Sequence, residues 1–503
     1  MFDDYGLTAA FKPGGFKEKS MYMRGFMIDS ARCMESREYY RRFIQFCAAK
    51  GLNTILWHFS DDQGLSLELP SEPGLADKHA YRADEMRDLI AYAERNGITL
   101  IPELETLGHS RYITRRTDYQ HLCESDGDFT AICPLHPETR SLMKRLLGDV
   151  ADIFPSPWIH VGLDEIKLGG HPLTREALKT QSVSELLAEY VSFIYNEVKS
   201  LGRKMIMWVD QNSFDTGFIQ DLPRDILIAV WQYHPDVTPE LAQRLLDTGF
   251  DVLLCPALIT YDQQAYPGKI ALPNIERMSG YQQLSGKGKV VGALTTIWTP
   301  MRFLHDSLWP SLSIAADTML SEGNMDISRS LKNYIRTFHD AEPTPGIIGA
   351  LKLSFDIAPK RKEYLSILTA RPEQLKHSAL VRSSADWSMI ADQIKRFLPI
   401  VRSECRTLET LRLFAGWMSY LYKRAALLKS DSATAEETDY IVAEGEKWLG
   451  KLEQVWDHER FADDPRRFAP VFDWEEAEYL LINFRKSLQV VEAHSKGSLI
   501  SSN

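Results

Sequence analysis

Two adjacent carboxylic acids, Asp164 and Glu165, are the residues of this sequence best suited to acid–base chemistry. They end the stretch HVGLDE, which follows a run of apolar residues that reads as a buried strand. Because the chain turns where a strand ends, neighbouring side chains there can reach into one pocket. One acid can then stay ionised and stabilise positive charge, while the other, with a raised pKa, donates a proton to a leaving oxygen. The alternative interpretation is that Asp164 caps the next helix and Glu165 is solvated.

Other polar and aromatic side chains stand at similar points, directly after apolar runs. The polar ones are Asp29, Arg32, Ser60, Asp61, Asp62, Glu103, Glu105, His109 and Asp210, and the aromatic ones are Trp208, Trp231 and Trp298. Carboxyl ends of parallel strands meet at one rim of a barrel, so these residues are predicted to share one site with the acid pair. Trp57 lies inside its run and is expected in the core.

The elements that must position these residues are eight apolar runs that alternate with amphipathic segments. Eight such units within some 300 residues predict an α/β fold, a (β/α)₈ TIM barrel rather than an open doubly wound sheet, and no Gly-rich phosphate loop follows the first run. The predicted strands are 23–28, 54–59, 99–104, 158–162, 204–209, 226–231, 251–254 and 290–298, and the predicted helices are 37–50, 84–96, 137–151, 184–201, 239–248 and 308–320.

After residue 340 the pattern changes to apolar residues spaced by three and four. The stripes that begin at Trp387 and at Leu408 predict an all-helical C-terminal domain, which could pack against the barrel or form a homodimer contact. We therefore divide the chain into an N-terminal segment (1–20), a catalytic barrel (21–338), a helical domain (345–494) and a flexible tail (495–503).

Composition narrows the possible partners. The formal net charge of −11 and the lack of a basic cluster disfavour nucleic acid as a partner. No signal-like start and no apolar run of membrane-spanning length is visible, so a cytoplasmic protein without a membrane partner is expected. The six cysteines form no CxxC pair, which fits a reducing compartment, although Cys123 and Cys133 could pair in an oxidising one.

Several stretches together resemble glycoside hydrolase family 20, the β-N-acetylhexosaminidases, in the bacterial form with a helical C-terminal domain. They are RGFMIDSAR (24–32), LNTILWHFSDDQGLSLEL (52–69), IPELETLGHS (101–110), HVGLDE (160–165), AVWQY (229–233), TTIWTP (295–300) and LWPSLSIAADTML (308–320). The resemblance implies an exo-acting enzyme, an N-acetylglucosaminidase by preference, that cleaves terminal N-acetylhexosamine from glycans with retention. It implies no cofactor, because the substrate's own 2-acetamido oxygen is the nucleophile.

The resemblance also implies roles for individual residues. Glu165 would be the general acid and then the base, and Asp164 would hold the acetamido nitrogen and stabilise the charge of the intermediate. Tyr261 is similar to the tyrosine that bonds the acetamido oxygen, and Arg32 is similar to the arginine that bonds the 3- and 4-hydroxyls. The remaining residues would wall the sugar or lie close to the acid: Asp61, Glu105, His109, His160, Trp208, Trp231 and Trp298.

One departure from the family pattern concerns selectivity. Many members carry a glutamate for the 4- and 6-hydroxyls where this chain has Pro300, and Arg302, His305 or Asp306 could replace it. Two further readings therefore stay open: the same fold acting on a 6-substituted sugar or a disaccharide unit, and a carbohydrate-binding protein without turnover. A metal site built from histidines and aspartates of the same rim is possible on residue types alone, but the resemblance argues against it, and we predict none.

Overall fold

The computed structural model describes residues 22–125, 128–260, 262–263, 265–430, 433–473, 476 and 479–495. Within them, eight parallel strands close into a barrel, since the last strand pairs with the first. The strands in barrel order are β1 (Met23–Asp29), β2 (Thr54–His58), β5 (Thr99–Glu103), β8 (Trp158–His160), β9 (Lys204–Val209), β10 (Leu227–Trp231), β11 (Val252–Cys255) and β13 (Val290–Ile297). The predicted TIM barrel and its eight strands are confirmed.

The seventh strand of the barrel is interrupted. A short strand, β12 (Ala257–Ile259), follows β11 and pairs with β13 further along. Pro256, which lies between them, has no N–H to donate to the ladder, and its carbonyl oxygen accepts a hydrogen bond from the Thr296 N–H at 2.8 Å. Two small hairpins add to the rim: β3 (Ser60–Asp61) with β4 (Gly64–Leu65), and β6 (Cys123–Ser125) with β7 (Asp128–Ile132).

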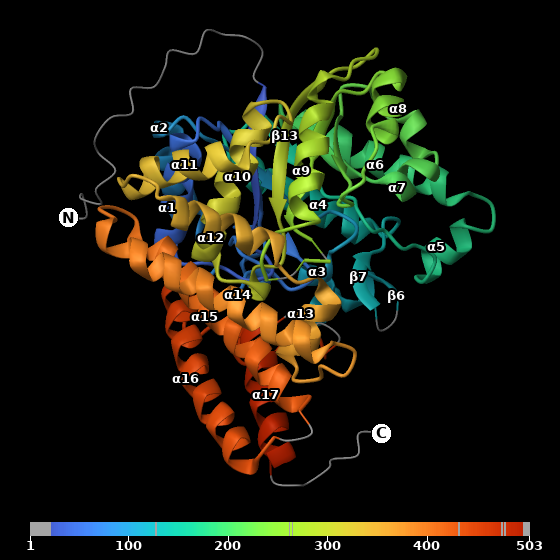
Figure 1. Ribbon diagram of the computed structural model, residues 1–503. Helices are drawn as coiled ribbons and strands as arrows, with labels where there is room; N and C mark the ends of the chain where they lie inside the picture. Colours follow the sequence, from blue (N-terminus) through green and yellow to red (C-terminus); the bar gives the residue numbers. More distant parts are fainter. Residues whose placement is uncertain are drawn as a thin grey trace.

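Helices surround the barrel, as Figure 1 shows. They are α1 (Arg37–Ala49), α2 (Ala83–Arg95), α4 (Pro137–Ile153), α6 (Val183–Ser200), α8 (Glu240–Thr248), α9 (Ala271–Gly280) and α10 (Trp309–Leu320). All were predicted except α9, whose sequence includes Pro273 and Asn274 and so lacks a plain amphipathic stripe. Asn274 is nevertheless buried, and its side chain accepts a hydrogen bond from the Ala257 N–H at 3.1 Å.

Shorter helical segments lie in the connections. The α-helical ones are α3 (Arg111–Thr114), α5 (Pro172–Ala177) and α7 (Gln211–Asp215), and the 3₁₀ turns are η1 (Pro73–Leu75), η2 (Thr117–Leu122), η3 (Phe218–Asp221), η4 (Tyr281–Gln283), η5 (Pro300–Arg302), η6 (His305–Leu308), η7 (Leu398–Ile400) and η8 (Pro465–Arg467).

The C-terminal region is helical and packs against the barrel, where the long helices α14 to α17 (orange to red in Figure 1) form one block. Its helices are α11 (Ile327–His339), α12 (Pro345–Asp356), α13 (Arg361–Leu368), α14 (His377–Phe397), α15 (Cys405–Leu428), α16 (Ala435–Glu459) and α17 (Leu480–Ser495). The loop 340–344 between α11 and α12 lies in the gap between the two predicted domains, 21–338 and 345–494, and α11 itself falls almost wholly within the range that was predicted for the barrel. The N-terminal segment 1–20 and most of the tail lie outside the described residues.

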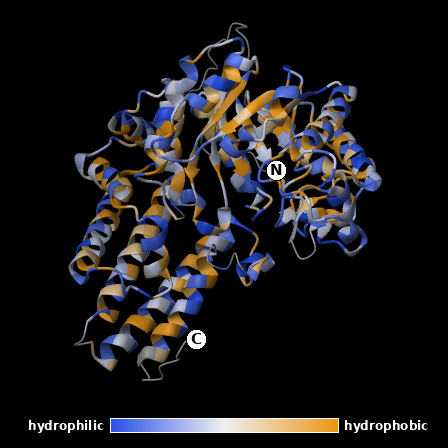
Figure 2. Ribbon diagram, turned by 90° about the vertical axis from the view of Figure 1, so that its right-hand side faces the viewer, coloured by the Kyte–Doolittle hydropathy of each residue, from blue (hydrophilic) through white to orange (hydrophobic). Residues whose placement is uncertain are grey.

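Hydrophobic side chains fill two separate cores. Those that face the barrel axis, among them Met27, Leu56, Ile206 and Leu253, form an inner cluster. The outer faces of the strands pack against the helices, and this alternation gives the orange strands at the centre of Figure 2. Trp57 belongs to the outer core, where its ring lies 4.6 Å from that of Tyr40, so its predicted core role is confirmed.

The structure bears on two expectations from the sequence, one about a membrane-spanning helix and one about a disulfide. In the part of the chain that the structure describes, no helix is both long and apolar enough to span a bilayer. All six cysteines are free thiols, so the alternative disulfide between Cys123 and Cys133 is not formed.

Candidate active site

A cavity of about 320 Å³ opens at the carboxyl ends of the barrel strands. It is lined by seven of the predicted site residues, namely Arg32, His109, Asp164, Glu165, Trp208, Trp231 and Trp298, together with Tyr233, Ile259, Thr260, Thr299 and Arg302. A wider depression of about 700 Å³ adjoins it and shares His109, Glu165 and Trp231 with it. The inner cavity therefore has an outer neighbour into which a longer ligand could extend.

The turn after β8 places the two acids. Gly162, Leu163 and Glu165 have φ of +68°, +78° and +49°, so this turn runs through left-handed backbone. At Gly162 a Cβ would lie 1.8 Å from a carboxylate oxygen of Glu105, which makes glycine necessary there. Backbone of this kind in non-glycine residues stores strain and is typical of functional sites. The turn also ends β8 at His160, two residues earlier than predicted.

The same turn gives the two carboxylates different surroundings. The side chain of Asp164 is 14% exposed and that of Glu165 is 62% exposed. The next helix, α5, is capped by the side chain of His171, which accepts a hydrogen bond from the Leu173 N–H. The alternative interpretation of Asp164 as a helix cap is therefore wrong.

His109 joins the two acids to the barrel. Its Nε2 lies 3.4 Å from Glu165 and 3.7 Å from Asp164, while its Nδ1 lies 3.0 Å from Asp62 and 3.4 Å from Asp61. Burial would lower the pKa of His109, but the surrounding carboxylates outweigh it and raise that pKa well above its usual value. A positively charged imidazolium thus lies between the acid pair and two further aspartates.

These surroundings move the pKa values of the two acids in opposite directions. Burial raises the pKa of Asp164 to about 6, against the opposing effect of His109. The hydrogen bond from His109 is the main cause that lowers the pKa of Glu165. In the unliganded site the proton therefore resides on Asp164 more readily than on Glu165.

Arg32 is held in place by carboxylates below the cavity. Its Nη1 lies 2.9 Å from Asp29 and its Nη2 lies 2.8 Å from Asp61, and its guanidinium lies 5.2 Å from the ring centre of Trp298. Asp61 in turn accepts from Nε2 of His58 at 2.7 Å. Burial would raise the pKa of Asp61, but Arg32 and the histidines hold it well below its usual value. Arg32 is therefore presented to the cavity in a fixed orientation.

A second layer of buried charge supports this wall. Nδ1 of His58 lies 2.9 Å from Glu103, and the indole N–H of Trp208 donates to the same carboxylate. Burial would lower the pKa of His58, but Glu103 and Asp61 raise it well above its usual value. The indole of Trp208 is thus fixed by a charge-assisted hydrogen bond while its ring faces the cavity.

Three of the predicted site residues, Asp61, Glu105 and His160, lie behind the cavity wall rather than on it. Both carboxylate oxygens of Glu105 are buried, and burial, with Asp164 nearby, raises its pKa well above the usual value, which favours the neutral acid. Burial lowers the pKa of His160 to about 4, and its Nδ1 accepts the Gly162 N–H at 3.1 Å. The structure thus places these three where they can support the acid-bearing turn. Tyr261, also predicted here, lies outside the described residues.

The aromatic wall includes one residue that sequence reasoning did not single out. Tyr233 accepts a hydrogen bond from the indole N–H of Trp298 at 2.8 Å, and its ring lies 5.3 Å from that of Trp231. It follows Trp231 by two residues, so the alternation of an extended chain could have placed both on one side. The cavity thus combines aromatic rings with charged groups, which suits a polar ligand that carries an apolar substituent.

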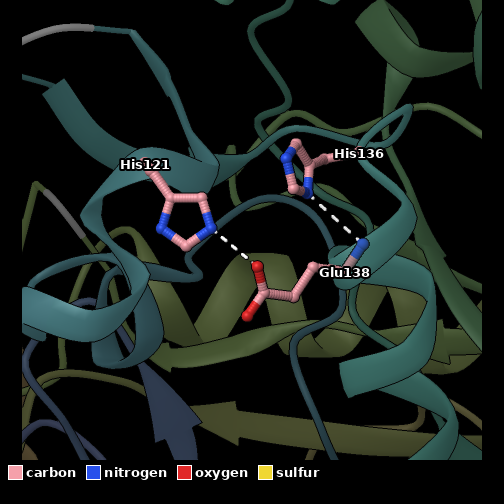
Figure 3. Close-up of side chains that lie close together, drawn as sticks. All are labelled: His121, His136 and Glu138. Atoms are coloured by element: carbon pink, nitrogen blue, oxygen red, sulfur yellow. Dashed lines mark hydrogen bonds and ion pairs between the residues drawn. The ribbon is translucent and has the colours of Figure 1, made fainter.

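One further cluster of histidines lies on the rim, and Figure 3 shows it. Nε2 of His121 lies 2.7 Å from the carboxylate of Glu138, and Nδ1 of His136 accepts the Glu138 N–H at 3.3 Å. A neutral His136 that accepts through Nδ1 carries its proton on Nε2, and the positive end of α4 disfavours a cation there. These contacts are those of a helix cap and a surface ion pair, so we assign the cluster no metal.

Comparison with known proteins is consistent with this geometry. The model of the glycosyl hydrolase family 20 catalytic domain matches residues 22–319, which is more than half of the chain. A β-hexosaminidase of Vibrio furnissii is 29% identical over 275 residues, covering 47% of this chain and 43% of that protein. Human β-hexosaminidase subunit beta is 24% identical over 262 residues, covering 48% and 46%. The chain thus spans less than half the length of these two relatives.

Solved structures show the same fold. The exo-β-N-acetylglucosaminidase of Vibrio harveyi, in complex with N-acetylglucosamine, matches with a TM-score of 0.52 and 24% identity over 63% of this chain and 57% of that one. Flavobacterium johnsoniae chitobiase matches with a TM-score of 0.53 and 16% identity over 84% of this chain and 74% of that one. At these identities the likeness concerns the fold alone.

Proposed function

The chain belongs to glycosyl hydrolase family 20, and on that premise we propose that it is an exo-acting β-N-acetylhexosaminidase that removes a terminal N-acetylhexosamine with retention. The observation that carries the proposal is the pair Asp164 and Glu165, bridged by His109, at the wall of a cavity lined by three tryptophans. A glycosidase needs an acid beside the leaving oxygen and negative charge beside the reacting centre, and this pair offers both.

The proposed reaction uses the acetamido group of the substrate. Its oxygen attacks the anomeric carbon while the bond from that carbon to the leaving oxygen breaks, and Glu165 donates its proton to the leaving oxygen. The resulting oxazolinium ion carries positive charge, which the Asp164 carboxylate stabilises through the N–H group. Water then attacks the anomeric carbon as Glu165 removes its proton, and the acetamido group is restored. Two displacements at one carbon give retention.

Substrate binding must reverse the proton order of the free site. An acetamido N–H that donates to Asp164 favours the ionised form of that acid, while a sugar that covers Glu165 removes water and favours its neutral form. Both effects move the pair toward an ionised Asp164 and a protonated Glu165. The two pKa shifts of the free site are therefore compatible with the proposed roles.

The test of the function is the initial rate of hydrolysis on three chromogenic substrates between pH 4 and 8. They are an N-acetyl-β-glucosaminide, the corresponding β-glucoside and the N-acetyl-β-galactosaminide. Activity confined to the acetamido sugars supports the proposal, and the ratio of the two gives the preference at C4. Binding of the acetamido sugars by calorimetry with no turnover would instead favour a carbohydrate-binding protein.

The raised pKa of Asp164 predicts an alkaline limit to activity. The productive form of the pair carries one proton on Glu165, whereas the free site holds that proton mainly on Asp164. Above pH 6 this proton is lost, so kcat/KM should fall about tenfold for each pH unit, and just below pH 6 it should stay nearly constant. Because the bound sugar favours a protonated Glu165, kcat should fall only at higher pH. Steady-state rates at half-unit intervals from pH 4 to 8 separate the two profiles. A kcat/KM that stays constant between pH 6.5 and 8 contradicts this assignment.

A second candidate substrate, an acetamido sugar with an acidic group at its 6-position, is favoured by Arg302. Of the three residues considered as replacements for the usual glutamate, only Arg302 lines the cavity. His305 is paired with Glu35 and Asp306 with Arg42, both away from it. Arg302→Met should therefore lower kcat/KM for a 6-sulfated N-acetylglucosaminide by about tenfold or more, the scale of a lost charge-assisted hydrogen bond. An equal loss on the unsulfated substrate would argue for a structural role.

A further inference from the structure

We propose that the segment Glu459–Arg466, at the end of α16 and just after it, is a positioning element of the active site. It holds the two rim loops that carry Arg32 and Thr299–Arg302. The segment lies outside residues 22–319, which the family model matches, so it is an addition of the helical C-terminal region. The proposal rests on the proposed function for its catalytic consequence, but its structural consequence can be tested without any substrate.

Arg466 holds the loop after β1. It is buried, and its Nη1 donates to the carbonyl oxygens of Ala31 and Arg32, each at 3.1 Å. Nε and Nη2 of its guanidinium donate to the carboxylate of Asp464 at 2.8 to 3.1 Å, which fixes the plane of the guanidinium. The backbone of the arginine that lines the cavity is thus anchored by a residue 434 positions further along the chain.

Arg460 and Glu459 hold the loop after β13. Nη2 of Arg460 donates to the carbonyl oxygens of Pro300 and Phe303 at 2.7 and 3.0 Å. The carboxylate of Glu459 accepts the N–H groups of His305 and Asp306, both at 2.9 Å, and also pairs with Nη1 of Arg460 at 3.0 Å. All these groups are buried, so their loss would leave unpaired polar atoms on both sides.

The contacts to both loops come from the same short segment, Glu459–Arg466. The Ser36 N–H, at the end of the first loop, donates to the carbonyl oxygen of Glu459 at 2.7 Å. Both loops therefore depend on one segment of eight residues, and both contribute side chains to the cavity wall. Since rim loops are the mobile part of a barrel enzyme, an external anchor of this kind fixes the distance between Arg32 and Trp298.

The experiment compares Arg466→Met and Arg466→Lys with a matched control, Arg467→Met. Arg467 is the next residue and pairs with Asp457, without contact to either loop. A displacement of about 1 Å at a binding group can cost about 100-fold, so Arg466→Met should lower kcat/KM by about 10- to 100-fold, mainly through KM. The lysine variant should recover part of this loss, and the control should stay within about twofold of wild type.

A double-mutant cycle with Arg32→Met separates positioning from a general effect on folding. If Arg466 acts through Arg32, then Arg466→Met should have little further effect on kcat/KM in the Arg32→Met background. Additive losses, or a KM that Arg466→Met leaves unchanged, would overturn the proposal. Melting temperatures of all variants identify any loss that is due to unfolding.

Hydrogen exchange tests the anchor independently of catalysis. In Arg466→Met the amides of residues 30–36, and in Arg460→Met those of residues 301–306, should exchange faster, while peptides from β9 and β10 keep their wild-type rates. Unchanged exchange in both loops would overturn the proposal even in an active enzyme. A wild-type protein that hydrolyses no acetamido sugar would overturn the proposed function, and the exchange result would still decide the structural one. Should Arg460→Met fail to fold, the Arg466 comparison stands alone.

Discussion

Glu165→Gln should lower kcat on an N-acetyl-β-glucosaminide by about 10²- to 10⁴-fold, the contribution usual for a general acid and base. Glutamine keeps the size and polarity of the side chain but has no proton to give to the leaving oxygen. It also removes a negative charge 3.4 Å from Nε2 of His109. The rate of the first displacement should fall most on substrates with a poor leaving group. It should fall least on a dinitrophenyl glycoside, because the leaving oxygen of that substrate needs little protonation. A loss of equal size on both substrates would contradict the role of Glu165 as acid.

A matched control makes this result specific. Glu176, on the short helix α5 that follows the acid-bearing turn, is an exposed glutamate that pairs with Lys179 just beyond the end of that helix. Glu176→Gln changes the net charge by the same amount and should leave both kcat and KM unchanged. The side chain of Glu165 is mostly exposed, so the loss of its ion pair with His109 in Glu165→Gln should lower the melting temperature only slightly. Full activity of Glu165→Gln would show that another residue donates the proton.

The sequence was sufficient for the barrel because its pattern is repeated eight times. Strand runs such as Lys204–Val209 and the helices between them alternate with the period and length that a parallel sheet requires. Helix α9 was missed because its buried face includes the polar Asn274 and its first turn includes Pro273, so no stripe was visible. A local pattern thus predicts a helix when the buried face is apolar. It fails when a polar residue that makes a buried hydrogen bond interrupts that face.

The sequence was less informative about which rim residues reach the cavity. Residues at strand ends were all assigned to one site, yet Glu105 and His160 are buried behind the wall. Their placement depends on the left-handed turn through Gly162 and Leu163, which no periodicity predicts. A glycine in the sequence can indicate such a turn. Leu163 adopts the same left-handed conformation, and nothing in its residue type indicates this.

Long-range contacts were the least accessible to sequence reasoning. The helical C-terminal region was expected to pack on the barrel or to form a dimer contact, with no residue named. The structure shows that Arg466 and Arg460 bind carbonyl oxygens of two catalytic loops. The charged partners of these arginines, Asp464 and Glu459, are their near neighbours in the sequence, and their partners in the loops are uncharged backbone oxygens. No charge pattern in the sequence therefore reveals the long-range contact.

Asp164→Asn should lower kcat by about 10²- to 10³-fold with a much smaller change in KM. The asparagine oxygen can still accept the acetamido N–H, so the bound sugar keeps its hydrogen bond. What is lost is the negative charge, which matters most when the oxazolinium ion forms beside this mostly buried side chain. Initial rates and KM on the N-acetyl-β-glucosaminide measure both effects. A variant that loses affinity but not turnover would assign Asp164 to ground-state binding alone.

The stability of Asp164→Asn gives an independent check on the same carboxylate. The pKa of Asp164 is raised from 3.8 to about 6 in the folded protein, so the unfolded chain ionises this group more easily. Its charge therefore destabilises the folded state by up to about 3 kcal/mol above pH 6, and this penalty vanishes below about pH 4, where the group is protonated in both states. Asp164→Asn should thus unfold at a higher temperature than wild type at pH 7 and at nearly the same temperature at pH 4. A variant that is more stable yet far less active would show that the enzyme keeps a destabilising buried charge because the reaction needs it. A lower melting temperature at pH 7 would mean that the interaction with His109 outweighs burial, and that the pKa of Asp164 is not raised in the free enzyme.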